Sequence, residues 1–140
     1  MNNITFSVIK PDAVQNGYTI SILFKIERSG FQIIAMKMMQ ISQQIAKKFY
    51  QEHKNYCYFE SLITFMSSGP IVPIILKKEN AVKDFRILMG NKNPLYAENG
   101  TIRKLYAQSL ERNAIHGSDK NENVYKEYPF YFSDQEIFFK

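Results

Sequence analysis

The segment that predicts the first element of the fold is Ile4-Thr5-Phe6-Ser7-Val8-Ile9. It continues directly into Lys10-Pro11-Asp12. Apolar and polar side chains alternate along this segment, and a period of two is typical of a β-strand. Proline fixes its own φ angle and has no N–H to give to a sheet, so Pro11 predicts that the strand ends in a turn. The chain is therefore expected to open with a strand followed by a turn at residues 10–12.

The rest of the chain is predicted to alternate strands and helices. Strands are expected at residues 31–39, 71–76 and 114–116. Helices are expected after Gly17, after Ser42, over residues 59–66 and 79–89, and from a capping box formed by Asp119 and Glu122. Residues 91–113 carry turn signals and at most one short helical turn, and so long a loop in a compact domain is usually functional or an interface. The aromatic tail over residues 128–139 is expected to cover the core.

This order of elements favours the α+β class. We expect a ferredoxin-like βαββαβ fold, in which an antiparallel four-stranded sheet has helices packed on its faces. The 140 residues fit one domain of the commonest size, and no linker, internal repeat or low-complexity tract divides them. Residues 1–140 are therefore expected to form a single domain.

Composition limits the possible functions without selecting one. The 18 Lys and Arg against 13 Asp and Glu give a net charge of +5, which is compatible with nucleic acid, an anionic small molecule or solubility alone. With 45% hydrophobic residues, wholesale disorder is excluded. Cys57 has no partner for a disulfide within the chain, and no apolar run is long enough to span a membrane. We therefore expect a soluble cytoplasmic protein.

Few residues offer catalytic chemistry by themselves. The sequence contains no P-loop, no HExxH motif and no Cys/His cluster with metal-ligand spacing. It has two histidines, His53 and His116. A histidine in the setting of His116 is, taken alone, more often a packed residue than a catalytic one. His53 and Cys57 are assigned to packing or to the surface, since neither has the partner that chemistry would require.

Five separated motifs change this interpretation. In order along the chain they are Ile9-Lys10-Pro11-Asp12, Ser68-Gly69-Pro70, Met89-Gly90 followed by Asn93-Pro94, Gly100-Thr101-Ile102-Arg103, and Asn113-Ala114-Ile115-His116-Gly117-Ser118-Asp119. Together they resemble the successive motifs of nucleoside diphosphate kinases, with matching intervals and over nearly the whole chain. The resemblance implies a ping-pong transfer of the γ-phosphoryl group from a nucleoside triphosphate to a nucleoside diphosphate through a phosphohistidine, which maintains NTP and dNTP pools.

The resemblance also assigns the reacting groups. His116 matches the family's nucleophile, and a neutral imidazole nitrogen is a competent nucleophile near pH 7. Glu127 matches the glutamate that orients the ring, although without the resemblance it would be taken for a solvated residue. Tyr50 matches a tyrosine whose hydroxyl lies near the reacting phosphate, and it is equally compatible with a core position.

Further matches assign the nucleotide-binding groups. Lys10, Arg86 and Arg103 match the basic residues around the polyphosphate, where the planar guanidinium can bond two oxygens at once. Tyr58 is expected to stack on the base, with Leu110 against its other face, and Asn113 with Lys10 to hold the ribose hydroxyls. Stacking tolerates any base, so broad use of purines and pyrimidines is expected, and the resemblance implies ribo- and deoxyribonucleotides as partners. A Mg²⁺ ion would bridge the phosphates, and Asp119 could reach it through water or serve only as a helix cap.

The sequence also departs from the family pattern. Tyr56 stands where many relatives have a phosphate-binding arginine, and Lys92 stands in place of a threonine. We hypothesise that Lys92 restores the missing charge. Asn99 and the pair Lys104-Leu105 also differ from the usual residues, which affects loop rigidity and subunit contacts rather than chemistry.

Two other functions are compatible with some of these features. An RNA-binding ferredoxin-like domain would need its aromatic motif on a central strand, and no strand here supplies it. A nucleotide-binding protein without transfer activity is disfavoured by the presence of His116, Lys10, Arg103 and Glu127. We expect no stable nucleic-acid or membrane partner, and we expect a homo-oligomer, with a hexamer favoured over a tetramer.

Overall fold

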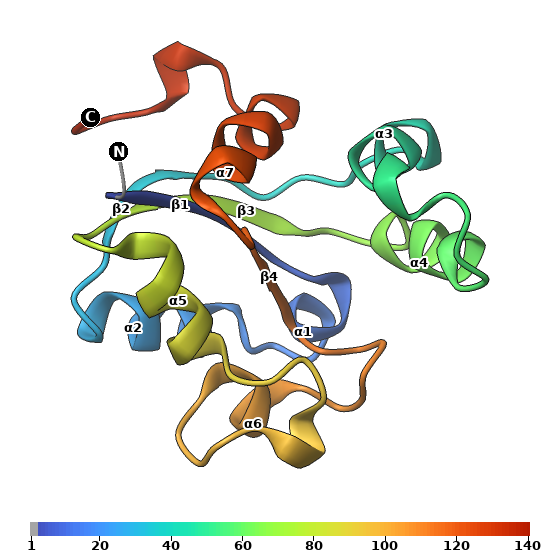
Figure 1. The fold of residues 1–140 in the computed structure, drawn as a ribbon, viewed down its shortest axis with the longest axis horizontal. Coiled ribbons are helices and arrows are strands. Elements are labelled where there is room, and N and C mark those ends of the chain that lie inside the picture. Colours follow the sequence, from blue (N-terminus) through green and yellow to red (C-terminus); the bar gives the residue numbers. More distant parts are fainter. Residues whose placement is uncertain (1–2) are drawn as a thin grey trace.

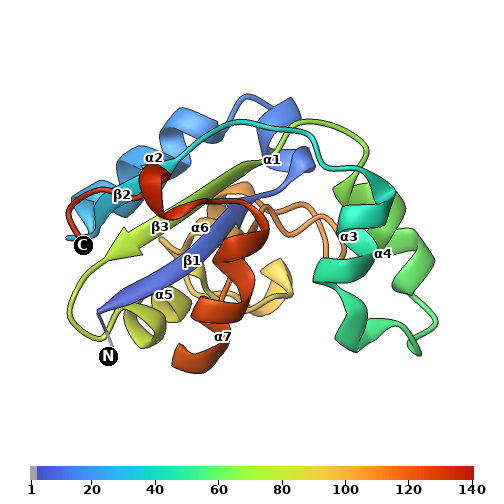
Figure 2. The same ribbon diagram turned by 90° about the horizontal axis from the view of Figure 1, so that it is seen from above.

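The computed structural model describes residues 3–140. Within them a four-stranded sheet is made of β1 (Ile4–Ile9), β2 (Gln32–Met36), β3 (Val72–Lys77) and β4 (Ile115–Gly117). The strands lie in the order β2-β3-β1-β4, and every neighbouring pair is antiparallel. The antiparallel sheet of the expected α+β fold is therefore confirmed (Figures 1 and 2).

Helices connect the strands, and one more helix follows the last strand. After β1 come α1 (Pro11–Gln15) and α2 (Thr19–Arg28), and after β2 come α3 (Gln43–Phe49) and α4 (Phe59–Met66). After β3 come α5 (Ala81–Met89) and α6 (Ile102–Tyr106), and after β4 comes α7 (Asn121–Glu127). Single 3₁₀ turns occur at η1 (Gln51–His53), η2 (Pro94–Tyr96), η3 (Tyr128–Phe130) and η4 (Asp134–Glu136). The path is the ferredoxin-like βαββαβ topology, into which the α3–α4 segment is inserted between β2 and β3.

Helices cover both faces of the sheet, so the fold has two cores. On one face Phe6 packs with residues of α3, α4, α7 and the C-terminal segment. On the other face Ile74 and Leu76 pack with residues of α2 and α5. Figure 1 separates these layers, with α7 above the sheet and α2 and α5 below it. Thr5 and Ser7 are fully buried as well, because they pair with Leu76 and Ile74 and so share the second face.

Pro73 lies inside the central strand β3, where proline normally removes a hydrogen bond from the ladder. Its carbonyl accepts a hydrogen bond from the N–H of Lys37 at 3.3 Å, on the side of β2. The N and O of one strand residue point to the same side, so the missing N–H also faces β2, just beyond its end at Met36. The proline therefore removes no backbone hydrogen bond between β3 and β1.

Several predicted boundaries are confirmed. The hydroxyl of Ser42 accepts a hydrogen bond from the N–H of Ile45 at 3.1 Å and caps α3. Helix α4 spans the predicted residues, and α5 stops at Met89 with Gly90 as its C-cap at φ 83°. The tail covers the core as expected, because Tyr131 and Phe132 are buried.

Other details of the prediction are wrong. The second strand is shorter than residues 31–39: β2 spans Gln32–Met36 and is followed by an isolated bridge between Met39 and Ile71, because Pro73 has no N–H for the chain beyond Met36. Pro11 begins a short helix rather than a turn, since the first helical position does not need its N–H. Asp119 does not cap α7: the N-cap is Lys120, and the carboxylate of Asp119 pairs instead with Arg86.

Candidate active site

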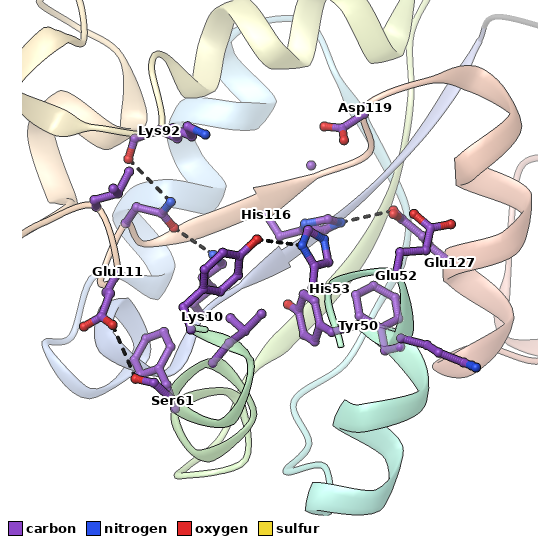
Figure 3. A pocket seen from close by; sticks show the side chains of 18 of the residues that line it. Lys10, Tyr50, Glu52, His53, Ser61, Lys92, Glu111, His116, Asp119 and Glu127 are labelled. Carbon is purple, nitrogen blue, oxygen red and sulfur yellow. Dashed lines mark hydrogen bonds and ion pairs between the residues drawn. The ribbon is translucent and has the colours of Figure 1, made fainter. Parts of the chain in front are cut away.

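A cavity of about 1390 Å³ is lined by β4, α7, the α3–α4 segment and the loop between α5 and β4. Figure 3 shows the side chains that converge on it. All the site residues expected from the sequence line this one cavity, although they come from distant parts of the chain: Lys10, Tyr50, Tyr58, Arg86, Lys92, Arg103, Leu110, Asn113, His116, Asp119 and Glu127.

His116 is held by a carboxylate at one ring nitrogen. Its Nε2 lies 3.1 Å from Oε1 of Glu127, and the hydroxyl of Ser118 donates to the same oxygen at 2.7 Å. His116 lies in β4 and Glu127 ends α7, so two regular elements fix the pair. A neutral imidazole that donates from Nε2 keeps its lone pair on Nδ1, which makes Nδ1 the available nucleophile.

The backbone before His116 is held in an unusual conformation. Ala114 has φ 74°, a left-handed conformation that costs about 1 kcal/mol or more for a residue with a side chain. Its N–H donates to Oδ2 of Asp12 at 3.0 Å, and its carbonyl accepts from the N–H of Lys10 at 2.9 Å. Asp12 is buried, and burial raises the pKa of its carboxyl group. The sequence reasoning gave Asp12 no role, although a carboxylate directly after Lys10-Pro11 was the signal that could have found it.

Lys10 is the most enclosed of the site's cations. Its Nζ donates to Oδ1 of Asn113 at 2.8 Å, and the side chain is only 9% exposed. Burial, together with the nearby charge of Arg103, lowers the pKa of Lys10 to about 8, while Asp12 acts in the opposite direction. The ammonium group is therefore charged at neutral pH but poorly neutralised by the protein, as expected of a group that binds an anion.

Two arginines extend the positive region. Arg103 donates from NH1 to the carbonyl of Gly90 at 3.1 Å and from NH2 to the carbonyl of Ile115 at 2.7 Å. Burial and the neighbouring Arg86 lower the pKa of Arg103 to about 10, so it is still charged at neutral pH. Arg86 itself pairs with Asp119, NH1 to Oδ1, at 2.7 Å. Arg103 thus lies close enough to Lys10 to lower its pKa, and Arg86 close enough to Arg103 to do the same, and an anion bound between these cations would relieve the repulsion.

Tyr50 lines the cavity together with His116 and Glu127. It follows α3, and its ring makes an edge contact with Phe49 at 4.9 Å, while Phe49 in turn contacts the ring of His116 at 5.7 Å. The hydroxyl of Tyr50 is buried and has no hydrogen-bond partner among residues 3–140. Burial raises the pKa of Tyr50 well above its usual value, with smaller contributions from Tyr131 and Glu127. The hydroxyl therefore stays neutral and keeps its proton for donation.

The outer part of the cavity offers aromatic and aliphatic surface. Tyr58 and Leu110 are 43% and 52% exposed there, and Lys92 lines the same opening. His53 also lines the cavity, and its Nδ1 is hydrogen-bonded to the hydroxyl of Tyr58 at 2.8 Å. The sequence reasoning assigned His53 to packing or to the surface; its spacing of five residues from Tyr58 was the signal that could have linked them.

The donor groups fit a metal ion only when phosphates share it. Residues 3–140 contain no group of three or more His, Cys, Asp or Glu side chains that could hold a metal ion by themselves. Asp119 supplies one exposed carboxylate beside Arg86. Mg²⁺ commonly binds through one or two carboxylates, substrate phosphates and water, so this arrangement fits Mg²⁺ bound together with a polyphosphate.

Comparison with known proteins agrees with this chemistry. The model of the nucleoside diphosphate kinase family matches residues 3–137. The nucleoside diphosphate kinase of Flavobacterium psychrophilum is 49% identical over 136 residues, which cover 97% of this chain and 98% of that protein. That of Histophilus somni strain 2336 is 47% identical over 134 residues, with 96% and 95% covered.

Solved structures show the same likeness in three dimensions. The nucleoside diphosphate kinase of Aquifex aeolicus superposes with a TM-score of 0.94 at 36% identity, covering 96% of this chain and 98% of that one. The halophilic enzyme of Halobacterium salinarum, solved in complex with CDP, gives a TM-score of 0.93 at 33% identity, with 98% and 91% covered. By sequence and by fold, the chain belongs to the nucleoside diphosphate kinase family.

Proposed function

We propose that His116 is the residue through which this protein performs the family's reaction. Nucleoside diphosphate kinases transfer the γ-phosphoryl group of a nucleoside triphosphate to a nucleoside diphosphate by way of a phosphohistidine, and this chain is such a phosphotransferase. The observation that carries the assignment is the bond between Nε2 of His116 and Glu127, 3.1 Å long, which leaves Nδ1 free to react. His53, the other histidine, has no such carboxylate partner among residues 3–140.

The proposed reaction has two steps of the same kind. Nδ1 of His116 attacks the γ-phosphorus, an N–P bond forms, the bond to the β–γ bridging oxygen breaks, and the nucleoside diphosphate leaves. The terminal phosphate oxygen of a second nucleoside diphosphate then attacks the phosphohistidine, and the N–P bond breaks. Glu127 stabilises the positive charge that develops on the ring during the first step and keeps Nε2 protonated.

The cations of the cavity are proposed to bind the polyphosphate. Phosphoryl transfer depends mainly on positioning and on neutralising the charge of the non-bridging oxygens. Lys10, Arg86 and Arg103 supply that charge, and the buried hydroxyl of Tyr50 donates toward the transferred group. Lys92 is proposed as an additional phosphate contact.

The nucleoside is proposed to occupy the outer part of the cavity. The base stacks on Tyr58 with Leu110 on its other side, while Asn113 and Lys10, already hydrogen-bonded to each other, hold the ribose hydroxyls. None of these contacts reads the identity of a base, so nucleotides with any base are expected substrates. Both ribo- and deoxyribonucleotides are proposed as partners.

Mg²⁺ is the proposed cofactor, and Asp119 is the residue expected to reach it, through water. When bound with the nucleotide, the ion would neutralise phosphate charge. To take up this role, Asp119 would exchange its contact with Arg86 for the hydrated ion, which frees the guanidinium for phosphate.

The assembly is proposed to be a homo-oligomer, with a hexamer favoured over a tetramer. Ile20 and Phe24 of α2 and Leu105 of α6 line one hollow and are 75%, 64% and 52% exposed, and apolar surface of this extent is commonly covered by a partner. Native mass spectrometry at micromolar concentration should give a multiple of 16.4 kDa. A monomer under these conditions would refute the proposal.

We place the protein in the cytoplasm, with nucleotides rather than nucleic acid or membrane as its partners. The exposed free thiol of Cys57 suits a reducing compartment. None of the helices in residues 3–140 has the length and apolar character needed to cross a membrane. Fractionation of the producing cell, followed by immunodetection, tests the location.

The experiment that tests the function follows the phosphoryl group. The protein is incubated with ATP labelled in the γ-phosphate and Mg²⁺, and then chased with a mixture of nucleoside diphosphates. We expect an acid-labile, base-stable phosphoprotein whose label moves to every diphosphate. Glu127→Gln should form it about 10- to 100-fold more slowly, the usual cost of losing a group that orients a ligand histidine.

The two histidines provide a matched control. His116→Ala should take up no label, and His53→Asn should be labelled like the parent protein. Absence of label in the parent protein, or label that survives His116→Ala, would overturn the assignment.

A further inference from the structure

Three aromatic side chains at the mouth of the cavity form one connected unit. The rings of Tyr56 and Tyr58 are stacked, 5.3 Å apart and 7° from parallel. The ring of His53 lies 5.7 Å from that of Tyr56 and 6.0 Å from that of Tyr58. The hydrogen bond of 2.8 Å between His53 Nδ1 and the hydroxyl of Tyr58 ties the histidine to the stack, and we call these three residues the aromatic platform.

The backbone brings the three rings together by consecutive turns. The N–H of Tyr56 donates to the carbonyl of His53 at 2.9 Å, and the N–H of Phe59 donates to the carbonyl of Tyr56 at 3.1 Å. His53 is the last residue of η1, and Tyr56 and Tyr58 lie between η1 and α4, so the three residues are three and two positions apart in the sequence. The platform is therefore a local structure that does not depend on distant parts of the chain.

The two faces of the Tyr58 ring have different surroundings. Tyr58 and His53 line the cavity, whereas Tyr56 does not. The stacked ring of Tyr56 covers one face of the Tyr58 ring, which leaves the other face for a ligand. Tyr56 and Tyr58 are nevertheless 56% and 43% exposed, so the stack is half-covered and can gain contact area from a third ring.

The platform is also connected to the reaction centre. The ring of His53 makes an edge contact with that of Tyr50 at 6.2 Å, and Tyr50 touches Phe49, which touches His116. Figure 3 shows His53 and Tyr50 side by side below His116 and Glu127. A base stacked on Tyr58 would therefore lie at a fixed place relative to the nucleophile, provided that His53 and Tyr56 hold the Tyr58 ring.

We propose that His53 and Tyr56 are positioning residues for the nucleobase: His53 fixes the edge of the Tyr58 ring through its hydroxyl, and Tyr56 supports its back. This rests on the proposed function, since it deepens the role given to Tyr58. Binding then costs less side-chain entropy, because the stacking ring is ordered before the nucleotide arrives. The effect acts on KM and depends on the presence of a base.

The test measures kcat and KM with ADP and with ribose 5-diphosphate, an acceptor that has the phosphates but no base. Tyr58→Phe and His53→Phe each remove the hydrogen bond and keep an aromatic ring. Each should raise the KM for ADP about 3- to 10-fold, the usual net value of one hydrogen bond, with kcat changed less than about 2-fold. The double variant should be no worse than either single one, because both lose the same bond.

Two further variants separate positioning from general damage. His53→Asn offers a polar group near the position of Nδ1 and should restore the KM for ADP. Tyr56→Ala should raise that KM about 3- to 10-fold through loss of the supporting ring. None of the variants should change the KM for ribose 5-diphosphate.

The outcomes are distinct from those of the labelling experiment. The proposal is overturned if the KM for ADP does not respond, if it responds equally for the acceptor without a base, or if the effects of Tyr58→Phe and His53→Phe add up. In each case the parent protein still forms its phosphohistidine. Loss of that phosphohistidine would instead refute the proposed function.

Discussion

Lys10 combines burial with positive charge, and this gives the site a dependence on pH. With a pKa lowered to about 8, its ammonium group loses its proton as the pH rises through that value. The phosphates of the nucleotide are already fully ionised there, since their last pKa lies near 6. Above pH 8 the free enzyme therefore loses one cation while its ligand keeps its charge.

We therefore expect kcat/KM to fall above about pH 8, and kcat to persist to higher pH because the bound polyphosphate raises the pKa of Lys10 again. Lys10→Gln should lower kcat/KM at pH 7 by about 10- to 100-fold, the value of a hydrogen bond to a charged group, and should remove this limb of the profile. Initial rates from pH 6 to 10 test the expectation. A parent profile that stays flat to pH 9.5 would contradict it.

Lys92 lines the cavity and is predicted to replace the cation that is lost because Tyr56 stands in place of a phosphate-binding arginine. Lys92→Ala should raise the KM for ATP about 3- to 10-fold, as expected for an exposed cation near a polyphosphate. Lys54→Ala is the matched comparison, because Lys54 also lines the cavity and is two residues from Tyr56. If the Lys92 variant keeps its KM and kcat while the Lys54 variant loses affinity, Lys54 takes the role instead.

The residues missed by the sequence reasoning act through other residues. Asp12 holds the N–H of Ala114, and His53 holds the hydroxyl of Tyr58. The first contact joins residues that are far apart in the sequence and meet only in the folded chain. The second joins residues five positions apart that meet because the chain turns between them. Lys10, His116 and Arg103 were found because a motif records their chemistry directly.

At the scale of the elements, Gly90 joins α5 to the loop that carries Arg103. It has φ 83° and ψ −178°, a conformation that is essentially limited to glycine. An added methyl carbon would also lie 2.7 Å from Cβ of Thr101, the residue that caps α6. Its carbonyl accepts the bond from Arg103.

Gly90→Ala should therefore lower the free energy of unfolding by about 3 kcal/mol, from backbone strain and the steric clash together. The KM for nucleotides should rise as well, because Arg103 loses its support. Gly100→Ala is the control: Gly100 also has a positive φ, 85°, but an added methyl would meet nothing within 4 Å. Its cost should be about 1 kcal/mol. Thermal unfolding of the two variants checks this, and equal losses would count against the clash with Thr101.

Element boundaries were predicted best where one residue decides them. Ser42 and Gly90 act on their own helices, so their local signals are sufficient. The capping signal of Asp119 failed because Arg86, 33 residues earlier in the sequence, competes for the same carboxylate. Local patterns cannot include such a competitor.

At the scale of the whole molecule, the net charge of +5 is less informative than its distribution. Lys10 precedes α1, Arg86 lies in α5 and Arg103 in α6, and all three line one cavity. The fold class and the antiparallel four-stranded sheet could be predicted because strands and helices alternate in a recognisable order. The convergence itself could be predicted only through the resemblance, since no single segment contains it.

The guanidinium of Arg103 also links the two ends of the loop over residues 91–113, through its bonds to Gly90 and Ile115. A nucleotide that binds this group must hold the loop closed, and its binding energy then protects the loop against proteases. At a concentration of 100 times its dissociation constant, ADP should slow tryptic cleavage at Lys92, Lys104 and Arg112 by about 100-fold. Peptide mapping of timed digests measures the rate, and Arg103→Gln should lose most of the protection. Resistance of this loop to trypsin is thus a measure of nucleotide occupancy that needs no phosphoryl transfer.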